Sequence, residues 1–382
     1  MELPEVRTQL DAIDSELLSL FVKRMELIDT VADIKRKDPS RPLYDPVRER
    51  EILMKVRENA GTEFGDAAHQ LFRTLLELSR ARQAAKLIPA TTVAARVAAM
   101  CANEKNVFPQ SGRIAVSGIE GCYAGTAAER IFPRGDIVFL NGFPAVVQAV
   151  QAGLCQYGIL PIENSSNGTV RNIYNLLREP DITIVRSARL LIRHVLLTQK
   201  SASLDGIRTI YTHEQAAGQC SKFLSALKNV DVVPCVSTAH AAQRAAEAND
   251  PSVAAIASES CAKLYGLTVL KDQIQNTDNN DTRFLCITKG AEFFAGADRL
   301  SIMVSCANSP GALYHMIAKI SALGINMVKL ESIPIPGTNF AYRFFMDLEC
   351  NLHQEGVLGL LCELERSCDS FTLLGNYTEM IG

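Results

Sequence analysis

A long apolar stripe that contains two basic residues is the strongest constraint on how the first part of this chain folds. Between residues 3 and 36, apolar side chains recur at steps of three and four, which predicts one long helix; they are Leu10, Ile13, Leu17, Leu20, Ile28 and Val31. The same face continues onto Arg24 and Lys35, which lie about 16 Å apart along a helix axis. A single charge on such a face usually extends to solvent. Two basic groups indicate a buried site for an anion, because an unpaired buried charge is costly.

Two further helices are predicted within the first 88 residues. Asp45 stands directly before a proline, the pattern of an N-cap followed by the first position of a helix over residues 46–59. Capping and substrate contact are equally open for Asp45. A third helix is predicted over residues 66–87. Its inward face becomes polar at Ser79 and Gln83, which are one turn apart.

Arg7 is also basic, but it lies roughly 100° around the first helix from Arg24 and about 25 Å away along the axis. One straight helix therefore cannot bring both side chains into one pocket. Arg7 can reach the pocket of a second copy of the chain. This geometry predicts a dimer whose long helices cross between the subunits.

Eight polar residues of this region stand in the order and spacing of the all-helical chorismate mutases, which the region resembles: Arg7, Arg24, Lys35, Asp45, Arg48, Glu49, Ser79 and Gln83. The resemblance implies an intertwined helical dimer that rearranges chorismate to prephenate without metal or cofactor. It also implies that the three arginines hold carboxylates, that Lys35 and Gln83 serve the ether oxygen, and that Asp45 and Glu49 serve the hydroxyl. Such a reaction needs a dianion held in a compact conformer, with positive charge near the breaking bond.

The pattern changes after a predicted linker over residues 89–111, which contains a short alanine-rich helix over residues 93–102. From residue 113 onward, strands, glycine turns and helices alternate in two successive α/β units. Ligands of open α/β sheets bind beyond the carboxyl ends of the strands. The polar strand-end loops therefore predict a cleft between two lobes within residues 112–290.

One polar stretch, Asn279–Phe284, is a candidate for the chemistry of this region. By itself it favours a polar turn before a strand over residues 284–288. However, Thr282 can donate a hydrogen bond to a departing oxygen, and Arg283 has a planar fork that suits a carboxylate. Together they suggest an anionic substrate that loses a hydroxyl group.

The central region resembles prephenate dehydratase over residues 113–288. The resemblance rests on Glu163-Asn164-Ser165 with Gly168, His213-Glu214-Gln215, Ser237-Thr238 and Thr282-Arg283-Phe284. It implies a two-lobed fold like that of periplasmic binding proteins, and conversion of prephenate to phenylpyruvate with Thr282 as hydrogen-bond donor to the leaving hydroxyl. The expected substrate contacts are Glu163, Asn164, Ser165, Gly168, Gln215, Ser237, Thr238, Arg283 and Phe284. We interpret His213 as structural.

One loop departs from that family. Its usual Gly-Pro-x-Gly-(Thr/Ser)-(Tyr/Phe)-Ser stands here as Gly118-Ile119-Glu120-Gly121-Cys122-Tyr123-Ala124. A hydroxyl is missing at Ala124, which puts the substrate contacts of this loop in doubt. The role expected for Thr282 is unaffected.

The last segment, residues 298–378, has the order βαββαβ of a ferredoxin-like fold. Its sequences Asn308-Ser309-Pro310-Gly311-Ala312-Leu313 and Glu331-Ser332-Ile333-Pro334 resemble the effector loops of an ACT domain. The resemblance implies feedback control by phenylalanine bound between two such domains, with Asn308, Gly311, Ala312, Leu313, Glu331 and Ser332 as contacts. Ile333 departs from a common arginine. The alternative is a dimerisation module that binds no ligand.

Bulk composition limits the partners of the whole chain. A formal net charge of −3 argues against nucleic acid or an anionic membrane as partner. The 11 cysteines form no paired CxxC set, and no apolar run suits a bilayer, so we expect a soluble cytoplasmic protein with reduced thiols and no metal. The combined resemblance is to bifunctional chorismate mutase/prephenate dehydratases that form a homodimer or a dimer of dimers. The alternatives are a dehydratase that prefers arogenate and a non-catalytic sensor of aromatic or amino acids.

Overall fold

The computed structural model describes residues 2–38, 45–87, 92–166, 168–179, 181–306, 311–335, 337–338 and 341–381. Their contacts divide the chain into two compact units. The first, the helical unit, comprises Met1–Ala95 with Gly359–Ser367. The second, the α/β unit, comprises Arg96–Leu358 with Cys368–Gly382. None of the helices in the described part of the chain combines the length and the apolar character needed to cross a membrane.

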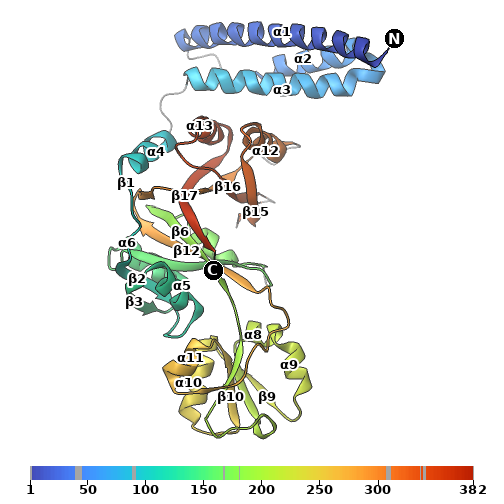
Figure 1. Ribbon diagram of the computed structural model, residues 1–382. Helices are drawn as coiled ribbons and strands as arrows, with labels where there is room; N and C mark the ends of the chain where they lie inside the picture. The colour runs from blue at the N-terminus through green and yellow to red at the C-terminus, as the bar shows by residue number, and fades with distance from the viewer. Residues whose placement is uncertain are drawn as a thin grey trace. The chain divides into compact units, whose positions relative to one another are not determined.

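Three long helices, α1 (Leu3–Lys37), α2 (Pro46–Asn59) and α3 (Gly61–Leu87), make up most of the helical unit (Figure 1). Asp45 caps α2, one of the two roles left open by the sequence, since its carboxylate accepts a hydrogen bond of 3.0 Å from the backbone N–H of Arg48. The third helix begins at Gly61, earlier than the predicted residue 66. A charged cluster joins α1 to α3, because Asp29 accepts two hydrogen bonds of 2.7 Å from Arg82 and lies 3.1 Å from the Lys86 ammonium.

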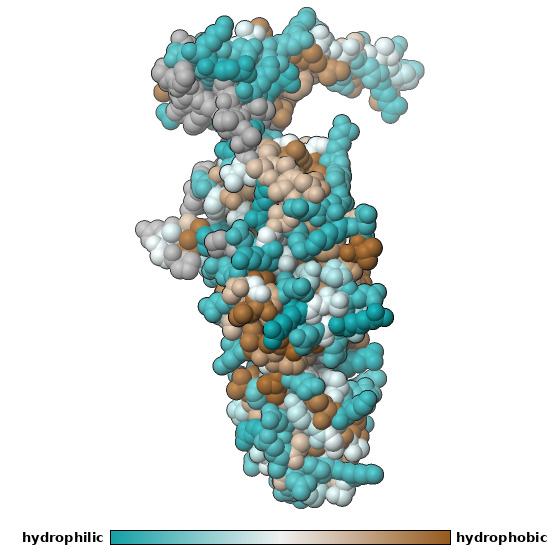
Figure 2. All heavy atoms as spheres, turned by 90° about the vertical axis from the view of Figure 1, so that its left-hand side faces the viewer, coloured by the Kyte–Doolittle hydropathy of each residue, from teal (hydrophilic) through white to brown (hydrophobic). Residues whose placement is uncertain are grey.

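The apolar stripe of α1 is largely uncovered within one chain. Leu10, Ile13, Leu17 and Leu20 are each more than half exposed, whereas Met25 and Ala32 are the buried residues of this helix. Figure 2 shows hydrophobic side chains at the surface of the helical unit among the hydrophilic ones. The seam predicted from the sequence is therefore a surface in the single chain.

The α/β unit begins in α4 (Thr92–Ala102), which lies within the predicted linker. Its first lobe contains β2 (Ser111–Ser117), α5 (Tyr123–Ile131), β3 (Arg134–Leu140), α6 (Phe143–Gln151), β4 (Tyr157–Asn164), β5 (Gly168–Thr169), α7 (Arg171–Leu176), β6 (Ile182–Leu191) and β12 (Asp281–Lys289). The short strands β1 (Glu104–Lys105) and β13 (Phe293–Phe294) pair with each other. Thus β12 starts at residue 281, and Thr282 and Arg283 lie within the strand rather than in a turn before it.

The second lobe is a five-stranded sheet in the order β11-β7-β10-β8-β9. Its elements are β7 (Val195–Thr198), a 3₁₀ turn η1 (Leu204–Gly206), β8 (Thr209–Thr212), α8 (Glu214–Gln219), α9 (Ser221–Ala226), β9 (Asp231–Pro234), α10 (Thr238–Ala248), β10 (Val253–Ala257), α11 (Ser260–Tyr265) and β11 (Thr268–Lys271). The chain passes from the first lobe to the second after β6 and returns to the first lobe before β12 (Figure 1). This two-lobed arrangement agrees with the architecture predicted for the central region.

The C-terminal elements follow the predicted βαββαβ order: β14 (Arg299–Ser305), α12 (Ala312–Ala322), β15 (Asn326–Pro334), β16 (Tyr342–Glu349), α13 (Val357–Ser367) and β17 (Ser370–Ile381). Their strands are arranged β15-β16-β14-β17, the order of a ferredoxin-like sheet. The last strand, β17, is 12 residues long and extends beyond its pairing with β14. Its extension pairs in parallel with β6, from Thr378 opposite Arg186 to Ile381 opposite Arg189. One continuous sheet therefore joins the first lobe to the C-terminal strands.

Alternation along β12 separates the side chains of neighbouring residues onto two faces of this sheet. Phe284 and Cys286 lie in the core that includes α5 and parts of the second lobe. Leu285 and Ile287 lie in a different core with α6, α7 and residues of the C-terminal strands. The same alternation assigns Thr282 to the face of Phe284 and Arg283 to the face of Leu285.

The acid stability of the helical unit is expected to depend on Asp29. The hydrogen bond from Arg82, followed by the contact with Lys86, lowers the pKa of Asp29 from its usual range to about 2. A carboxylate whose pKa is lowered by folding stabilises the protein above its unfolded pKa of about 3.9, and that stabilisation is lost as the pH falls through the folded value. We predict that Asp29→Asn flattens the loss of thermal stability between about pH 4 and pH 2, as measured by circular dichroism melting. An unchanged pH profile in this variant would contradict the assignment.

Candidate active sites

One face of the helical unit gathers several of the residues predicted for an anion site. Arg24 is partly buried, and its guanidinium donates to the Leu75 carbonyl at 3.1 Å and to the Ser79 hydroxyl. Burial lowers the pKa of Arg24. Ser79 and Gln83 are 3 % and 6 % exposed, as expected for residues that face inward. The side chains of α1 and α3 therefore meet at polar groups where a core would be apolar.

Gln83 has an unused hydrogen-bonding group in this region. Its Oε1 is buried and has no hydrogen-bond partner among the described residues. Buried polar atoms are normally paired, so an orphaned one indicates a missing ligand or partner. Nearby on α2, Glu49 accepts a hydrogen bond from Arg80. Lys35 is partly buried, whereas Arg48 and Arg7 are exposed.

In the α/β unit, Thr282 lies directly opposite Asn164 across β12 and β4. The Asn164 Nδ2 group donates to the Thr282 hydroxyl oxygen at 2.8 Å and to Asn280 Oδ1 at 2.9 Å. The Asn164 Oδ1 atom accepts from the backbone N–H of Ser166 at 3.0 Å, which fixes the orientation of the amide. Because the Thr282 oxygen accepts from Asn164, its own hydrogen remains available to a ligand. The arrangement makes Thr282 a directed donor.

The loop after β4 is tied to the start of β12. Ser165 Oγ donates to the Asn279 carbonyl at 2.7 Å and accepts from the Asp281 N–H at 2.8 Å. Gly168 pairs with Asn164 through β5 and has a φ of +76°, a conformation that favours glycine. Strand pairing and these two hydrogen bonds hold Asn164 and Thr282 together.

The predicted residues of the second lobe lie where helices begin after strands. Ser237 caps α10 by accepting from the His240 N–H at 3.2 Å, and Thr238 is the first residue of that helix. His213 caps α8 by accepting from the Gln215 N–H at 3.3 Å, as expected for a structural histidine. Gln215 itself is exposed. Backbone N–H groups at such helix starts favour anionic ligands.

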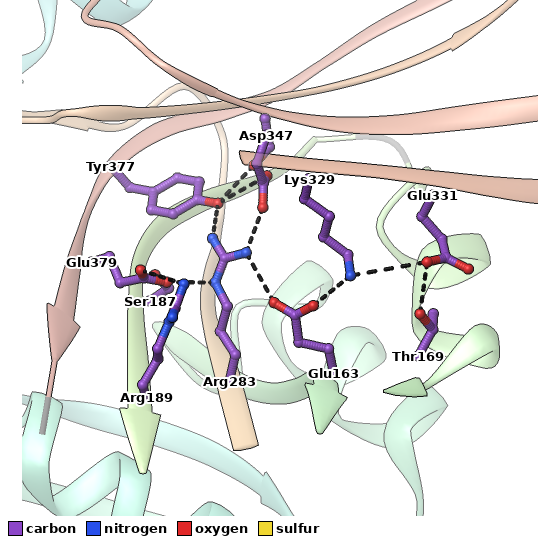
Figure 3. Close-up of polar contacts among 11 residues, drawn as sticks. Glu163, Thr169, Ser187, Arg189, Arg283, Lys329, Glu331, Asp347, Tyr377 and Glu379 are labelled. Atoms are coloured by element: carbon purple, nitrogen blue, oxygen red, sulfur yellow. Dashed lines mark hydrogen bonds and ion pairs between the residues drawn. The ribbon is translucent and has the colours of Figure 1, made fainter. Parts of the chain in front are cut away.

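Arg283 does not share the environment of Thr282. Its side chain is 4 % exposed and is held by three carboxylates of the chain itself: Glu163 at 3.4 Å, Glu379 at 2.7 Å, and Asp347. Tyr377 accepts a further hydrogen bond of 2.9 Å from it (Figure 3). Burial opposes the charge, but Tyr377, Asp347 and Glu379 outweigh it and raise the pKa of Arg283. The Arg283 guanidinium is thus held by side chains of the chain itself, an environment that differs from the expected contact with a substrate carboxylate.

The pairing of Arg283 belongs to a larger network of charges between the first lobe and the C-terminal strands. Glu163 also binds the Lys329 ammonium, and Lys329 lies 4.0 Å from Glu331, which accepts from the Thr169 hydroxyl at 2.8 Å. A pocket of about 260 Å³ adjoins this network, lined by Glu163, Asn164, Ser165, Arg189, Asp281, Arg283, Val328 and Lys329. Thr282 is not among its lining residues, whereas Asn164, which donates to the Thr282 hydroxyl, is one of them.

The candidate effector residues lie on α12 and β15. Gly311 precedes α12 with a φ of +83°, and Ala312 and Leu313 open that helix. On β15, Glu331 faces Thr169, Ser332 is exposed, and Ile333 is buried in the core that includes α6 and α7. Asn308 lies outside the described residues.

Two sequence models of protein families match the chain. The model described as Chorismate mutase type II matches residues 6–84, and the model described as Prephenate dehydratase matches residues 114–292. A curated Escherichia coli K12 protein, bifunctional chorismate mutase/prephenate dehydratase, is 30 % identical over 380 residues, covering 97 % of this chain and 95 % of that protein. The chain belongs to the bifunctional chorismate mutase/prephenate dehydratase family.

Other similar proteins share the α/β unit of this family. A chloroplastic arogenate dehydratase/prephenate dehydratase 2 of Arabidopsis thaliana is 33 % identical over 278 residues, covering 69 % of this chain and 72 % of that protein. A solved prephenate dehydratase from Arthrobacter aurescens in complex with L-Phe is 26 % identical, with a TM-score of 0.64, and covers 70 % of this chain and 90 % of that chain. A structure described as GqqA, a novel type of quorum quenching acylase, is 29 % identical, with a TM-score of 0.64, and covers 69 % of this chain and 97 % of that chain.

Two residues that the family resemblance places near the substrate are buried in the structure. Ala124, where the family usually has a serine, is 8 % exposed and packs in the core with α5. Phe284, predicted as a substrate contact, is 3 % exposed in the same core. The Phe284 side chain therefore packs in a core on the same face of β12 as Thr282.

Sequence reasoning missed the residues that surround Arg283. Asp347 and Glu379 occupy buried positions of β16 and β17, where their carboxylates are 0 % and 3 % exposed. A charged residue within a strand of apolar neighbours was the available signal in each case, since buried charges are normally paired. The partner could not be read from that signal, because Arg283 is distant in the sequence.

The orientation of the Asn164 amide gives a direct test of the dehydratase site in this family. In Asn164→Asp, the new carboxylate accepts the Thr282 hydrogen and directs it away from a ligand. Loss of one preorganised donor costs about a hundredfold or more in kcat. We expect a decrease of that size in phenylpyruvate formation, measured by ultraviolet absorbance, with Thr282→Ser as a control that keeps the hydroxyl. Activity in Asn164→Asp close to that of the parent protein would contradict the proposed direction of donation.

Proposed function

We propose that the chain rearranges chorismate to prephenate in its helical unit and converts prephenate to phenylpyruvate in its α/β unit. The observation that carries the second activity is the Thr282 hydroxyl, which accepts from Asn164 and keeps its hydrogen for a ligand. The first activity is supported by the polar seam of Arg24, Ser79 and Gln83 between α1 and α3. Family membership supports both. We assign the activities to residues 1–88 and 112–290, with a linker over 89–111 and a regulatory domain over 298–378.

In the helical unit, catalysis requires positioning and charge rather than covalent chemistry. Arg24 and Arg48 are proposed to hold the carboxylates of chorismate in a compact conformer, while Lys35 and the buried Gln83 amide donate to the ether oxygen. As the carbon–oxygen bond breaks, negative charge grows on that oxygen, and nearby donors stabilise it. Asp45 and Glu49 are proposed to face the hydroxyl. Asp45 also caps α2, so the two roles left open by the sequence are compatible.

The mutase site is proposed to be shared between two chains. Arg7 is exposed, and the apolar residues of α1 between Leu10 and Leu20 are more than half exposed in the single chain. A contiguous apolar face of this kind is typical of an interface. Pairing two copies along α1 covers that face and brings Arg7 into the partner's site. We propose a homodimer, or a dimer of dimers, as the functional form.

In the α/β unit, the substrate itself supplies most of the driving force. The bond to the ring carboxylate breaks and releases carbon dioxide, its electron pair enters the ring, and the hydroxyl leaves with one proton as water. The ring becomes aromatic. Thr282 is proposed to donate a hydrogen bond to the departing hydroxyl, with water supplying the proton, because an alcohol is a poor acid. Asn164, Ser165, Gly168 and the helix starts at Gln215 and at Ser237 and Thr238 are proposed to position the anion.

The ferredoxin-like segment is proposed to be an ACT domain that binds phenylalanine. A related dehydratase was solved in complex with L-Phe. Gly311 lets the backbone approach a ligand at the start of α12, and Glu331 and Ser332 lie on β15, the edge strand of the sheet. Gly311, Ala312, Leu313, Glu331, Ser332 and Asn308 remain the proposed contacts. Binding inhibits the enzyme only if the ligand prefers one of two states of the site.

Arogenate is the second candidate substrate of the α/β unit. The observation that favours it is the similarity to a plant arogenate dehydratase/prephenate dehydratase over 69 % of the chain. The helical unit favours prephenate, since a mutase supplies that compound directly. The ratio of kcat/KM for the two substrates, measured on the same preparation, decides between them.

Removal of the Thr282 hydroxyl is expected to separate the two activities. We predict that Thr282→Ala lowers phenylpyruvate formation by about 10²–10⁴-fold, because a positioned donor contributes on that scale. Conversion of chorismate to prephenate is expected to stay at the parental rate, since Thr282 belongs to the other unit. Both rates are followed by ultraviolet absorbance, and Thr282→Ser is the matched control. Undiminished dehydration in Thr282→Ala would remove this residue from the mechanism.

Mixed dimers test whether Arg7 acts in the partner's mutase site. Arg7→Ala and Arg24→Ala homodimers are each expected to be nearly inactive. If Arg7 crosses between subunits, a heterodimer of the two variants contains one intact site and one doubly defective site. Random exchange after co-expression should then restore about a quarter of the parental mutase activity per site. If both arginines serve the same chain's site, no activity returns.

A further inference from the structure

Side chains of the C-terminal domain contact β4 and β12 on the face of the sheet that is opposite Thr282. Thr282 and Asn164 are neighbours across β12 and β4, and Arg283 and Glu163 are the next pair along. The first pair forms the proposed donor. The second pair projects to the opposite face, where the C-terminal strands pack (Figure 3). Each residue of the donor pair is therefore bonded through the backbone to a residue of the charged pair.

Backbone pairing is interrupted at this point of the sheet. After Arg283 the register between β12 and β4 shifts, so that Phe284 lies opposite Pro161 rather than Ile162. Such a bulge bends the strand and redirects its side chains. Since β12 keeps a regular register with β6 from Asp281 to Cys286, the irregularity falls on the β4 side, next to Glu163 and Asn164. Contacts made by the Arg283 and Glu163 side chains take a larger share in positioning Thr282 and Asn164.

The two carboxylate oxygens of Glu163 contact residues of different domains. One of its oxygens lies 3.4 Å from the Arg283 guanidinium, and the other accepts from the Lys329 ammonium of β15. Burial raises the pKa of this carboxyl, but the hydrogen bond and charge of Lys329, with Arg283, outweigh burial and lower it. Glu163 is partly exposed, so without Lys329 it can turn toward solvent. Asn164 would then lose the fixed position of its neighbour.

We propose that Lys329 is a positioning residue of the dehydratase site, acting through Glu163 on the Asn164–Thr282 pair. This inference rests on the proposed dehydratase activity. Lys329 does not touch the reacting atoms: it lies on the side of the sheet opposite Thr282, and its ammonium is occupied by Glu163. The C-terminal domain thus contributes to the precision of the dehydratase site, in addition to any ligand that the domain binds.

The test compares Lys329→Met with Lys289→Met in the full-length chain. Lys289 is a matched control, since it lies at the far end of β12 and donates to the Gln151 carbonyl at 2.7 Å. We expect Lys329→Met to lower the dehydratase kcat about tenfold, because small displacements of catalytic groups are costly, while KM changes less than about twofold. Lys329→Arg, which keeps the charge on Glu163, should recover most of kcat. Lys289→Met should behave as the parent.

Mutase activity and the melting temperature are measured on the same samples, so that a folding defect is recognised. A dehydratase kcat for Lys329→Met equal to that of Lys289→Met would overturn the proposal. A fall in kcat that Lys329→Arg does not reverse would overturn it as well, since the charge would then be irrelevant. If the parent protein forms no phenylpyruvate at all, the proposed function fails, which is a distinct result.

Discussion

The buried Arg283 guanidinium is the constraint on which the architecture of the α/β unit depends. An isolated charge in a protein interior is very costly, and it is tolerated only with close partners of opposite charge. Here the partners come from separate parts of the chain: Glu163 from β4, Asp347 from β16 and Glu379 from β17. The C-terminal strands must therefore pack against the first lobe for this arginine to be buried. Extension of β17 along β6 makes that packing part of one continuous sheet.

Because side chains alternate along β12, the buried Arg283 can lie next in sequence to Thr282, the proposed hydrogen-bond donor. Thr282 and Arg283 are adjacent in sequence but face opposite sides of the sheet. On one side, the Asn164 amide orients a hydroxyl. On the other, carboxylates of the C-terminal domain hold a guanidinium. The short motif thus combines the hydroxyl proposed to act on the substrate with a guanidinium that fixes the strand.

The helical unit follows a different physical principle, because the mutase site proposed for it needs residues of a second chain. Arg24, Ser79 and Gln83 are buried or partly buried together, and the Gln83 oxygen has no partner among the described residues. Along the rest of α1, apolar side chains such as Leu10 and Leu17 are exposed. In the dimer proposed above, a second copy covers these side chains and completes the anion site. The α/β unit, by contrast, supplies its donor from a single chain.

Local pattern was sufficient to predict the helices of the first unit, the Asp45 cap, the order of strands and helices in the two lobes, and the ferredoxin-like order at the C-terminus. Periodicity and capping depend on residues close in sequence, so the chain itself determines them. The Asn164–Thr282 pair was predicted only as two separate motif residues. Their hydrogen bond, the extra length of β17 and the partners of Arg283 were decided by the tertiary structure. Asp347 and Glu379 are far from Arg283 in the chain, and only the packing of strands brings those charges within reach of one another.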